Sequence, residues 1–527
     1  MDLRQLRAER LLAWAAAVVG VIGLVSALTP EMADRFDVVR GVLPPGLPEA
    51  ARVLSVAFGI GLIWLSRSLA MRRRRAWQLA VAVVVASAAA HLAKGLDFEE
   101  AAISLLLLVA LVRWRRRFEA PGDPASVRPL LALGVAFAGV AAVAGGAEVR
   151  GVELSPRLGD ALLGLGIALG FFSLYFWLRP FGHAVVQTVG ERRMARSLVD
   201  AYGSDSLAFF ALRRDKSYLF SPSRRAFLAY RVVGGTALVS GDPVGDDAEI
   251  DELLTELRRL ARAHGWRLAV VGVSAEQLDR YRALGLKPVP IGDEAVLRPQ
   301  EFSLEGRAIR KVRQSVSRLR KAGYDFRVVP ADKVEPTLEA ELESVSIAWR
   351  RGQPERGFSM SIDDLHVPGT MLALAEDSTG RLGGFLHLAP TAAGGWSLSA
   401  MRRRPDAPNG LTEFLVVETL AWARDAGATE LSLNFCALTD FVAPERVTTA
   451  LRRVVRRGLL LADNVFQLER LYSFNRKFFP EWRRRYICVE RLSDLPAVGL
   501  AYLHAESLLV PPGPWARRRE ARRRAAA

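Results

Sequence analysis

The side chains best suited to acid–base chemistry surround one turn in the segment Met401 to Leu415, MRRRPDAPNGLTEFL. A turn at Gly410 precedes an apolar pattern with helical spacing. Three polar residues lie around the predicted helix N-terminus: Asp406, Asn409 and Glu413. Free N–H groups there suit an anion or a developing oxyanion, and Asn409 or Thr412 is expected to cap the helix. The alternative is a capped helix with ordinary surface carboxylates.

Aromatic and basic side chains alternate in the segment Phe466 to Glu490. Pro480 divides this segment into a helix-like half and an extended half. The aromatic side is expected to be buried, and the other side carries five cations: Arg476, Lys477, Arg483, Arg484 and Arg485. Such cations bind phosphate groups. The alternative is a closing helix and strand whose arginines form a solvated face.

The segment Glu305 to Gly323 predicts the most basic helix. Its apolar stripe contains Ile309, Val312, Val316 and Leu319. Cations fall largely outside that stripe: Arg310, Lys311, Arg313, Arg320 and Lys321. The basic face therefore fits either a phosphate-contacting surface that reads no sequence, or a plain solvated side.

Several common chemistries lack their motifs. The sequence has no Gly-Xaa-Ser-Xaa-Gly elbow, no HExxH pair and no Walker loop. His183, His366 and His387 are too scattered to predict a metal site, and a lone histidine is more often structural. The glycine signature that binds acetyl-coenzyme A is missing before Gly410. We therefore predict neither a metal nor a cofactor.

Length and charge limit the classes of protein that fit. The chain has 527 residues, which predicts two or three domains. Lysine and arginine outnumber aspartate and glutamate by 72 to 56, and the net charge is +16. This excess indicates phosphates on nucleic acid or on anionic lipid as partners. Cys436 and Cys488 are too few for a disulfide framework and fit a reducing compartment.

The first part of the chain, residues 1–180, predicts a membrane domain. Six apolar runs are candidates to cross about 30 Å of hydrocarbon. They are Leu11 to Leu28, Val53 to Ala70, Ala76 to Ala93, Ala101 to Val112, Leu130 to Gly146 and Ala161 to Leu178. The fourth run is the shortest.

Arginine placement predicts the orientation of these helices. Basic residues precede the first run, follow the second at Arg72 to Arg75, and follow the fourth at Arg113 to Arg117. Loops such as Asp34 to Arg40 mix signs or lean acidic. With six helices, every basic loop falls on one side, which the positive-inside rule makes cytoplasmic. We therefore expect a multi-pass plasma-membrane protein with both termini and the soluble half in the cytoplasm, and no cleaved signal peptide.

From about Gln187 the pattern becomes that of a soluble α/β protein. Strands are predicted at Leu207 to Leu212, Ser217 to Phe220, Ala226 to Val232, Thr236 to Ser240, Arg267 to Val273, Asp325 to Val329, Leu372 to Glu376, Gly383 to Leu388, Trp396 to Met401 and Glu430 to Phe435. Helices are predicted at Ile250 to His264, Val334 to Arg351 and Gly410 to Ala426. The order of elements repeats, which predicts two acetyltransferase-like domains in tandem, 187–300 and 301–491. A basic tail, 511–527, follows and could rest on anionic lipid.

Three segments resemble motifs of the phosphatidylglycerol lysyltransferase family. They are Leu471 to Arg485; Trp349 to Ser361, WRRGQPERGFSMS; and the Met401 turn together with Leu431 to Leu438, LSLNFCAL. In the third segment the matching positions are Arg402, Arg403, Asn409, Gly410, Glu413, Ser432, Leu433, Asn434 and Phe435. One position departs, because Ser399 stands where relatives usually carry an aspartate. If that carboxylate pairs with a lysine side chain, specificity for lysyl-tRNA is in question.

The resemblance implies transfer of an amino acid, lysine in the family's name, from aminoacyl-tRNA to the hydroxyl of phosphatidylglycerol. Aminoacyl-tRNA is already an activated ester, so the exchange needs no ATP, metal or covalent intermediate. The enzyme must align the reactants, assist proton removal and stabilise an oxyanion. The product would lower membrane negative charge and weaken binding of cationic antimicrobial peptides.

Roles for individual residues follow as hypotheses from this resemblance and from residue type. Glu413 or Asp406 would handle the proton or bind the amino group, while Asn434 and the helix start at Gly410 would orient the ester or its oxyanion. Phosphate of lipid or tRNA would contact Arg403, Arg476, Lys477 and Arg485, and the tRNA acceptor end would contact Arg310 and Lys311. Two alternatives stay open: another aminoacyl- or acyltransferase on the same fold, and a non-catalytic membrane anchor that binds tRNA or lipid.

Overall fold

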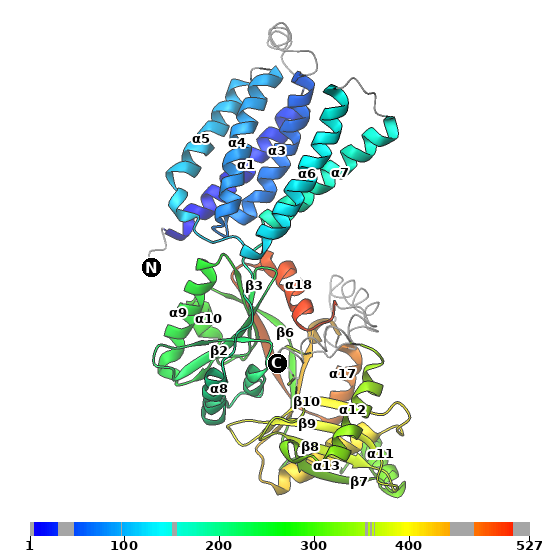
Figure 1. Cartoon of the computed structure of the whole chain (residues 1–527). Helices are drawn as coiled ribbons and strands as arrows, with labels where there is room; N and C mark the ends of the chain where they lie inside the picture. The colour runs from blue at the N-terminus through cyan, green and yellow to red at the C-terminus, as the bar shows by residue number, and fades with distance from the viewer. Residues whose placement is uncertain are drawn as a thin grey trace. The chain divides into compact units, whose positions relative to one another are not determined.

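The computed structural model describes residues 5–29, 47–95, 97–149, 155–353, 357–358, 361–362, 364–442 and 468–509. The chain divides into two compact units. The first comprises Met1–Gly182 with Arg259–Arg267, and the second comprises His183–Arg258 with Leu268–Ala527 (Figure 1). The predicted loop Asp34 to Arg40, the basic tail 511–527, and Phe466 lie outside the described residues.

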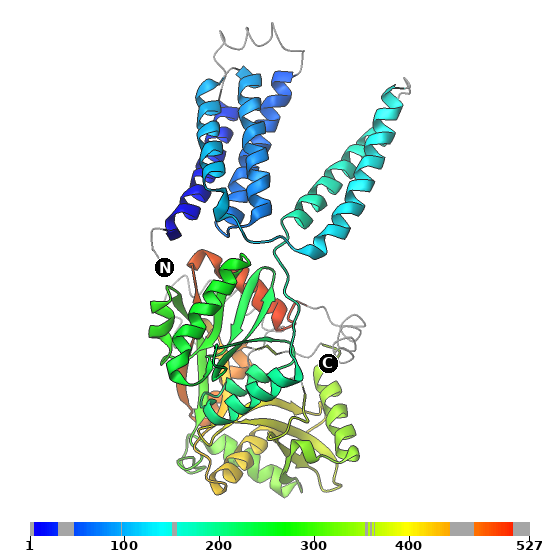
Figure 2. The same ribbon diagram turned by 60° about the vertical axis from the view of Figure 1, so that its left-hand side comes forward.

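The first unit contains a long helix at each of the six predicted apolar runs. They are α1 (Gln5–Leu28), α3 (Leu47–Leu69), α4 (Arg74–Gly95), α5 (Phe98–Arg113), α6 (Val127–Val149) and α7 (Pro156–Trp177). Within the described residues, five helices are long and apolar enough to cross a membrane. The fourth predicted span, α5, has 16 residues and is too short to count among them. Figure 2 shows α6 and α7, in cyan, packed side by side.

Close packing of α1 and α3 depends on two glycines. A Cβ at Gly20 would lie 2.6 Å from the carbonyl oxygen of Gly59, and a Cβ at Gly59 would lie 2.7 Å from that of Gly20. The backbones can approach so closely because neither residue has a side chain, which is the usual device of tightly packed apolar helices.

The second unit is built on one twelve-stranded sheet. The strands are β1 (Ser217–Phe220), β2 (Ala226–Val233), β3 (Thr236–Ser240), β4 (Val244–Gly245), β5 (Arg267–Val273), β6 (Lys287–Leu297), β7 (Asp325–Pro330), β8 (Met371–Glu376), β9 (Leu382–Pro390), β10 (Trp396–Arg403), β11 (Leu431–Ala437) and β12 (Glu481–Val489). Their order is β1-β2-β3-β5-β12-β6-β11-β10-β9-β8-β7, and β4 pairs with β2.

The last strand, β12, lies between two strands of the first half of this unit. It pairs antiparallel with both β5 and β6; Ile487 faces Val271, and Arg485 faces Gly292. The two halves therefore share one sheet, and the C-terminal strand completes the N-terminal half. The division into domains at residues 187–300 and 301–491 stays a prediction.

Helices cover both faces of the sheet. They are α8 (Val189–Tyr202), α9 (Asp247–Ala263), α10 (Leu278–Ala283), α11 (Arg310–Lys321), α12 (Pro336–Arg350), α13 (Leu411–Asp425), α14 (Thr439–Val442), α17 (Leu468–Asn475) and α18 (Leu495–Ala505). In the second half, α11 and α13 pack on one face of the sheet. The other face packs against α12, whose Leu342 and Val345 belong to one hydrophobic cluster with Phe385 of β9.

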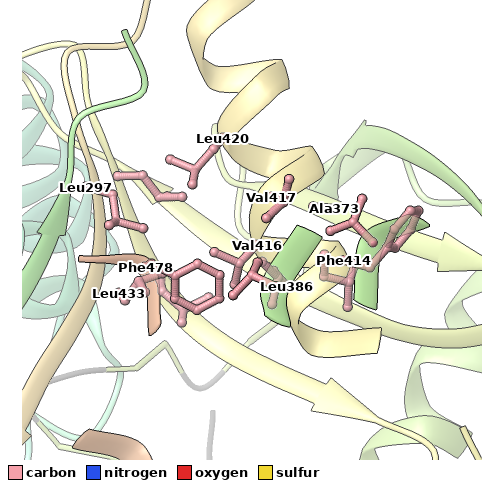
Figure 3. Packing of buried hydrophobic residues seen from close by; sticks show 14 of the residues in the cluster. Leu297, Ala373, Leu386, Phe414, Val416, Val417, Leu420, Leu433 and Phe478 are labelled. Carbon is pink, nitrogen blue, oxygen red and sulfur yellow. The ribbon is translucent and has the colours of Figure 1, made fainter. Parts of the chain in front are cut away.

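The largest hydrophobic core lies beneath α13. Figure 3 shows Phe414, Val416, Val417 and Leu420 of this helix beside Leu297, Ala373, Leu386, Leu433 and Phe478. The apolar stripe predicted for Glu305 to Gly323 joins the same core, because Ile309, Val312, Val316 and Leu319 are all buried. The helix itself begins only at Arg310, and Ile309 is its N-cap residue. The stripe is confirmed, and so is the aromatic packing of the C-terminal segment around Phe478, but Phe479, which was expected on the buried side, is 62% exposed.

One predicted strand is wrong. Leu207 to Leu212 was expected to be a strand, but Ala208–Leu212 forms a 3-10 helix, η3. Phe209 and Phe210 in it are fully buried. A short continuous apolar run is equally compatible with a buried strand and a buried helical turn, so periodicity could not separate the two.

Candidate functional site

Strands β10 and β11 separate part of the way along their length. Their parallel pairing covers Trp396 with Leu431 and Ser397 with Ser432. Beyond this point both strands are irregular: β10 shifts register against β9 between Leu398 and Ala400, and β11 shifts against β6 between Ser432 and Phe435. Such bulges redirect side chains and are frequent beside functional sites.

Asn434 lies at this separation and connects the two strands. Its φ is +68°, a left-handed conformation that asparagine tolerates better than most residues. Its Nδ2 donates to the carbonyl oxygen of Leu398 at 3.0 Å, and its Oδ1 accepts from Phe435 N at 2.9 Å. The amide is therefore held in a fixed orientation, which fits an orienting role.

A buried network of hydrogen bonds holds the backbone N–H of Asn434. Ser432 Oγ donates to Glu294 Oε1 at 2.5 Å and accepts from Asn434 N at 3.0 Å. Glu294 in turn pairs with Arg485, at 2.9 Å from Nε and 2.5 Å from Nη2. Asp205 accepts from Arg485 Nη1 at 2.7 Å. Burial alone would raise the pKa of Glu294, but Arg485 and the hydroxyl donors hold it below its usual value.

Arg485 therefore lies inside the sheet. Its side chain is only 4% exposed, and its guanidinium also contacts Ser206 Oγ and the carbonyl oxygen of Gly272. Burial lowers the pKa of Arg485, yet the two carboxylates raise it above its ordinary value. This placement favours support of the Asn434 strand over the direct phosphate contact predicted for Arg485.

Glu413 and Lys477 come together from the two principal motifs. Lys477 Nζ donates to Glu413 Oε1 at 2.7 Å. The glutamate side chain, in the first turn of α13, is 15% exposed, whereas Lys477 is 45% exposed. Lys477 also lies over the ring of Phe474, 5.2 Å from its centroid. A carboxylate and a cation thus meet beside the start of a helix, as the sequence led us to expect.

The turn before α13 is fixed by α11. Gly410 is the N-cap residue, with φ of +95° and no side-chain cap, so the predicted capping by Asn409 or Thr412 is wrong. Arg318 of α11 donates to the carbonyl oxygen of Asn409. A Cβ at Gly410 would lie 2.8 Å from Ser315 Cβ. The close approach of α11 occupies the space in which a larger residue would stand.

Replacing Gly410 by alanine should lower the free energy of unfolding by about 2 kcal/mol or more, because strain at positive φ adds to the clash with Ser315. Gly427→Ala is the matched control: its φ is +73°, but nothing lies within 4 Å of its Cβ position. It should cost about 1 kcal/mol from strain alone. Thermal unfolding of both variants in detergent measures the difference. Equal losses would contradict the packing argument.

The other predicted site residues do not join the Glu413–Lys477 pair. Asp406 is 61% exposed and pairs with Arg381 at 3.1 Å. Arg403 Nη1 donates to the carbonyl oxygen of Ala407 at 3.1 Å, which holds the turn. Arg476 is exposed in the 3-10 helix η6 (Arg476–Phe478), and Arg310 and Lys311 are exposed at the start of α11. The structure therefore unites Glu413 with Lys477 and places Asp406 in a surface ion pair.

Several contacts in this region were not predicted from sequence. Ser399, in the irregular part of β10, accepts a hydrogen bond from Ile362 N at 3.0 Å. Phe358 is fully buried, with Lys216 Nζ 4.9 Å from its ring centroid. Phe358 belongs to the Trp349 to Ser361 motif, and Ile362 follows that motif directly. The motif residues Glu355, Arg356, Ser359 and Met360 lie outside the described residues. Glu294, which supports Ser432, carried no sequence signal.

Asp242 is a further acid near the Arg485 network; the residue is half-buried, and its Oδ1 atom is buried. Its Oδ2 accepts from Ser274 N at 3.1 Å, and burial together with Asp205 raises the pKa of Asp242 to about 7, although Arg485 lowers it. The folded protein thus holds a proton that the unfolded chain releases near pH 4. The protonated Asp242 therefore stabilises the folded protein at pH 4, and this contribution to the free energy of unfolding is lost as the pH rises to about 7.

Asp242→Asn should therefore remove a pH dependence of stability. Wild type should lose up to a few kcal/mol relative to the variant between pH 4 and pH 7, and no more above that range. Asp279→Asn is the control, because that side chain is 93% exposed. Melting temperatures across this pH range test the prediction. A constant difference between wild type and Asp242→Asn would contradict it.

Across the described ranges, no group of three or more histidine, cysteine, aspartate or glutamate side chains is placed to hold a metal ion. The candidate site thus consists of the Glu413–Lys477 pair, the helix start at Gly410, and Asn434 at the strand separation. The chain is therefore a mixed α/β protein joined to apolar helices, with a carboxylate–cation pair at a helix start and an asparagine where two strands separate.

The chain belongs to the phosphatidylglycerol lysyltransferase family: the family model "Phosphatidylglycerol lysyltransferase, C-terminal" matches residues 196–489. Two relatives named lysylphosphatidylglycerol biosynthesis bifunctional protein LysX are each 33% identical over 95% of this chain. The one from Mycolicibacterium vanbaalenii is covered over 50% of its length, and the one from Mycobacterium tuberculosis over 46%. The chain therefore spans about half the length of these curated relatives.

Solved structures show the same fold in the second unit. L-PGS from Bacillus licheniformis is 22% identical with a TM-score of 0.53, over 59% of this chain and 95% of that one. A C-terminal domain from Agrobacterium fabrum is 24% identical with a TM-score of 0.53, over 61% of this chain and 98% of that one. At these identities the likeness concerns the fold.

Proposed function

We propose that this protein transfers an amino acid from aminoacyl-tRNA to a hydroxyl of phosphatidylglycerol. Family membership and the names of the relatives support this reaction class. The observation that carries the proposal is the meeting of Glu413 and Lys477, 2.7 Å apart, beside the N-terminus of α13. A proton acceptor, a cation and the first backbone N–H groups of a helix stand together there.

The chemistry is an ester exchange that these groups can perform. The lipid hydroxyl oxygen attacks the ester carbonyl carbon of the aminoacyl group, and its proton passes to Glu413. The tetrahedral oxyanion is stabilised by backbone N–H groups at the start of α13 and by the oriented Asn434 region. Collapse breaks the bond to the tRNA ribose oxygen, which takes the proton back from Glu413. One ester bond forms and one breaks.

Cations provide the binding surface for both substrates. Lys477 and Arg476 would contact the lipid phosphate or the tRNA end, and Arg310 and Lys311 on α11 would contact tRNA phosphates. The net charge of +16 supports an anionic partner. Arg403 would act through the turn that it holds, and Arg485 through the Glu294–Ser432 network.

The apolar helices of the first unit would anchor the enzyme in the membrane that contains its lipid substrate. Five of them are long and apolar enough to span it, and the orientation proposed next requires the shorter α5 to cross as well. We propose a plasma-membrane orientation with the arginine turn before α4 and the cluster after α5 on the cytoplasmic side, because short cytoplasmic loops retain positive charge. The product would lower surface negative charge and reduce sensitivity to cationic peptides.

The amino acid itself is best taken as lysine from the names of the relatives, with Ser399 as the position to examine. The test is incubation of the full-length protein in phosphatidylglycerol vesicles with separately supplied lysyl-, alanyl- and arginyl-tRNA. Formation of a labelled aminoacyl lipid from one of them supports the proposal. Binding of tRNA that weakens steeply with salt, without any labelled lipid, would instead support the non-catalytic anchor.

A further inference from the structure

His387, in the middle of β9, carries a buried nitrogen that has no hydrogen-bond partner among the described residues. The residue is completely buried. Its Nε2 lies 2.9 Å from Thr370 Oγ1, and that hydroxyl donates its own proton to the carbonyl oxygen of Val367 at 2.7 Å. Thr370 can therefore only accept, so Nε2 bears the imidazole proton. Nδ1 is left with a lone pair, and no described residue donates to it.

A second unpartnered polar atom lies on the same face of the sheet. Ser397 of β10 is also fully buried, and its Oγ has no partner among the described residues. Ser397 faces Ala389, which lies two residues from His387 along β9. Side chains two residues apart in a strand share a face, so Ser397 and His387 are diagonal neighbours. Leu386 and Leu388, the two neighbours of His387 in the strand, instead belong to the core beneath α13; Figure 3 shows Leu386 there.

This polar face adjoins the candidate site. Ser399, two residues beyond Ser397, accepts from Ile362 N, and Leu398 between them accepts from Asn434 Nδ2. Ala400 pairs directly with His387. Ser397 is thus in the last pair before β10 and β11 separate, and His387 lies beside it on the neighbouring strand β9.

The imidazole is a permanent acceptor. Burial, together with the positive charge of Arg402, lowers the pKa of His387 to about 3, while Asp364 opposes this shift and His366 adds to it. The ring thus stays neutral near neutral pH. A buried acceptor left without a donor costs about 1–3 kcal/mol. The complement of such a group is an N–H or O–H donor.

We infer that His387 Nδ1 and Ser397 Oγ bind the amino group of the aminoacyl substrate and so hold its ester carbonyl at the separation of β10 and β11. This inference rests on the proposed function. A primary amine of the transferred amino acid donates to both atoms, whichever amino acid it belongs to. The site therefore serves recognition of the aminoacyl group rather than of the lipid.

Two substitutions of one residue separate this role from a structural one. His387→Gln places an amide N–H near the position of Nε2 and keeps the bond to Thr370, but it removes the Nδ1 acceptor. His387→Asn places an amide oxygen near the position of Nδ1 but loses the Thr370 bond. We expect the glutamine variant to raise KM for charged tRNA about tenfold, with kcat and KM for phosphatidylglycerol within about twofold of wild type. The asparagine variant should keep KM for charged tRNA closer to wild type, and Ser397→Ala should raise it.

Two kinetic outcomes would contradict the inference. An unchanged KM for charged tRNA in His387→Gln, with a destabilised His387→Asn, would assign the histidine to structure, with a bound water at Nδ1. A rise confined to KM for phosphatidylglycerol would make the lipid hydroxyl the donor and overturn the inference. Melting temperatures of all three variants exclude misfolding. If wild type forms no aminoacyl lipid, the proposed function fails. Equilibrium binding of radiolabelled lysinamide and alaninamide to wild type and His387→Gln still tests the inference in that case. Tighter binding to wild type supports the inference, and equal binding overturns it.

Discussion

Replacement of Glu413 by glutamine should lower kcat for aminoacyl transfer by about 10²- to 10⁴-fold, the range expected for loss of a general base. Glutamine keeps the size of the side chain and can still accept a hydrogen bond from Lys477, which lies 2.7 Å from the carboxylate. It cannot take the proton of the lipid hydroxyl. KM for both substrates should change little, because the lost interaction belongs to the transition state.

Glu418→Gln provides the matched control on the same helix. Glu418 also pairs with a cation, Arg320, at 2.6 Å, and its side chain is 14% exposed, close to the 15% of Glu413. Transfer should stay within about twofold of wild type, since an ion pair of this kind contributes about 1 kcal/mol or less to stability and none to the reaction. A Glu413→Gln enzyme with wild-type kcat, or equal losses in both variants, would remove Glu413 from the chemistry.

Replacement of Arg485 by methionine should lower the free energy of unfolding by about 3–5 kcal/mol, because it leaves buried carboxylates without their cation. Glu294 is completely buried, and Asp205 is 25% exposed beside it. The loss should also reach the site, since Glu294 holds Ser432 and Ser432 accepts from Asn434 N. Chemical denaturation of the full-length protein in detergent measures the change.

The double variant Arg485→Met with Glu294→Gln should recover part of that loss, because a neutral amide costs less to bury than an unpaired carboxylate. Arg483→Met is the control on the same strand. Its side chain is 33% exposed and pairs with Glu430 and Glu481 near the surface, so its loss should be about 1 kcal/mol or less. If both single variants lost the same small amount, Arg485 would not be a buried structural cation.

The local parts of this fold could be predicted because their causes lie in nearby residues. The α11 stripe follows from apolar residues at helical spacing, and the turn at Gly410 follows from residues that favour turns. The six long helices of the first unit follow from apolar runs, although α5 is shorter than a span requires. We expected Glu413 and Lys477 to serve one site, because the segments Met401 to Leu415 and Phe466 to Glu490 carry the candidate carboxylates and cations.

The parts of the fold and of the candidate site that could not be predicted depend on contacts between segments distant in the sequence. Nothing near Glu481–Val489 indicates that this strand enters the sheet between β5 and β6, and that insertion is what buries Arg485. Asp406 appeared as good a base as Glu413 in the sequence, but Arg381, on another loop, holds it at the surface. His387 was read as one scattered histidine, because the pairing of β9 with β10 that places it beside Ser397 is not visible in sequence.

The most direct test of the central claim is mass spectrometry of lipids after incubation of the purified full-length protein with phosphatidylglycerol vesicles and charged tRNA. We expect a new aminoacyl phosphatidylglycerol that forms in proportion to the charged tRNA consumed, disappears when the tRNA is digested beforehand, and is nearly lost in Glu413→Gln. Complete absence of such a lipid with lysyl-, alanyl- and arginyl-tRNA, from a protein that binds both tRNA and vesicles, would contradict it.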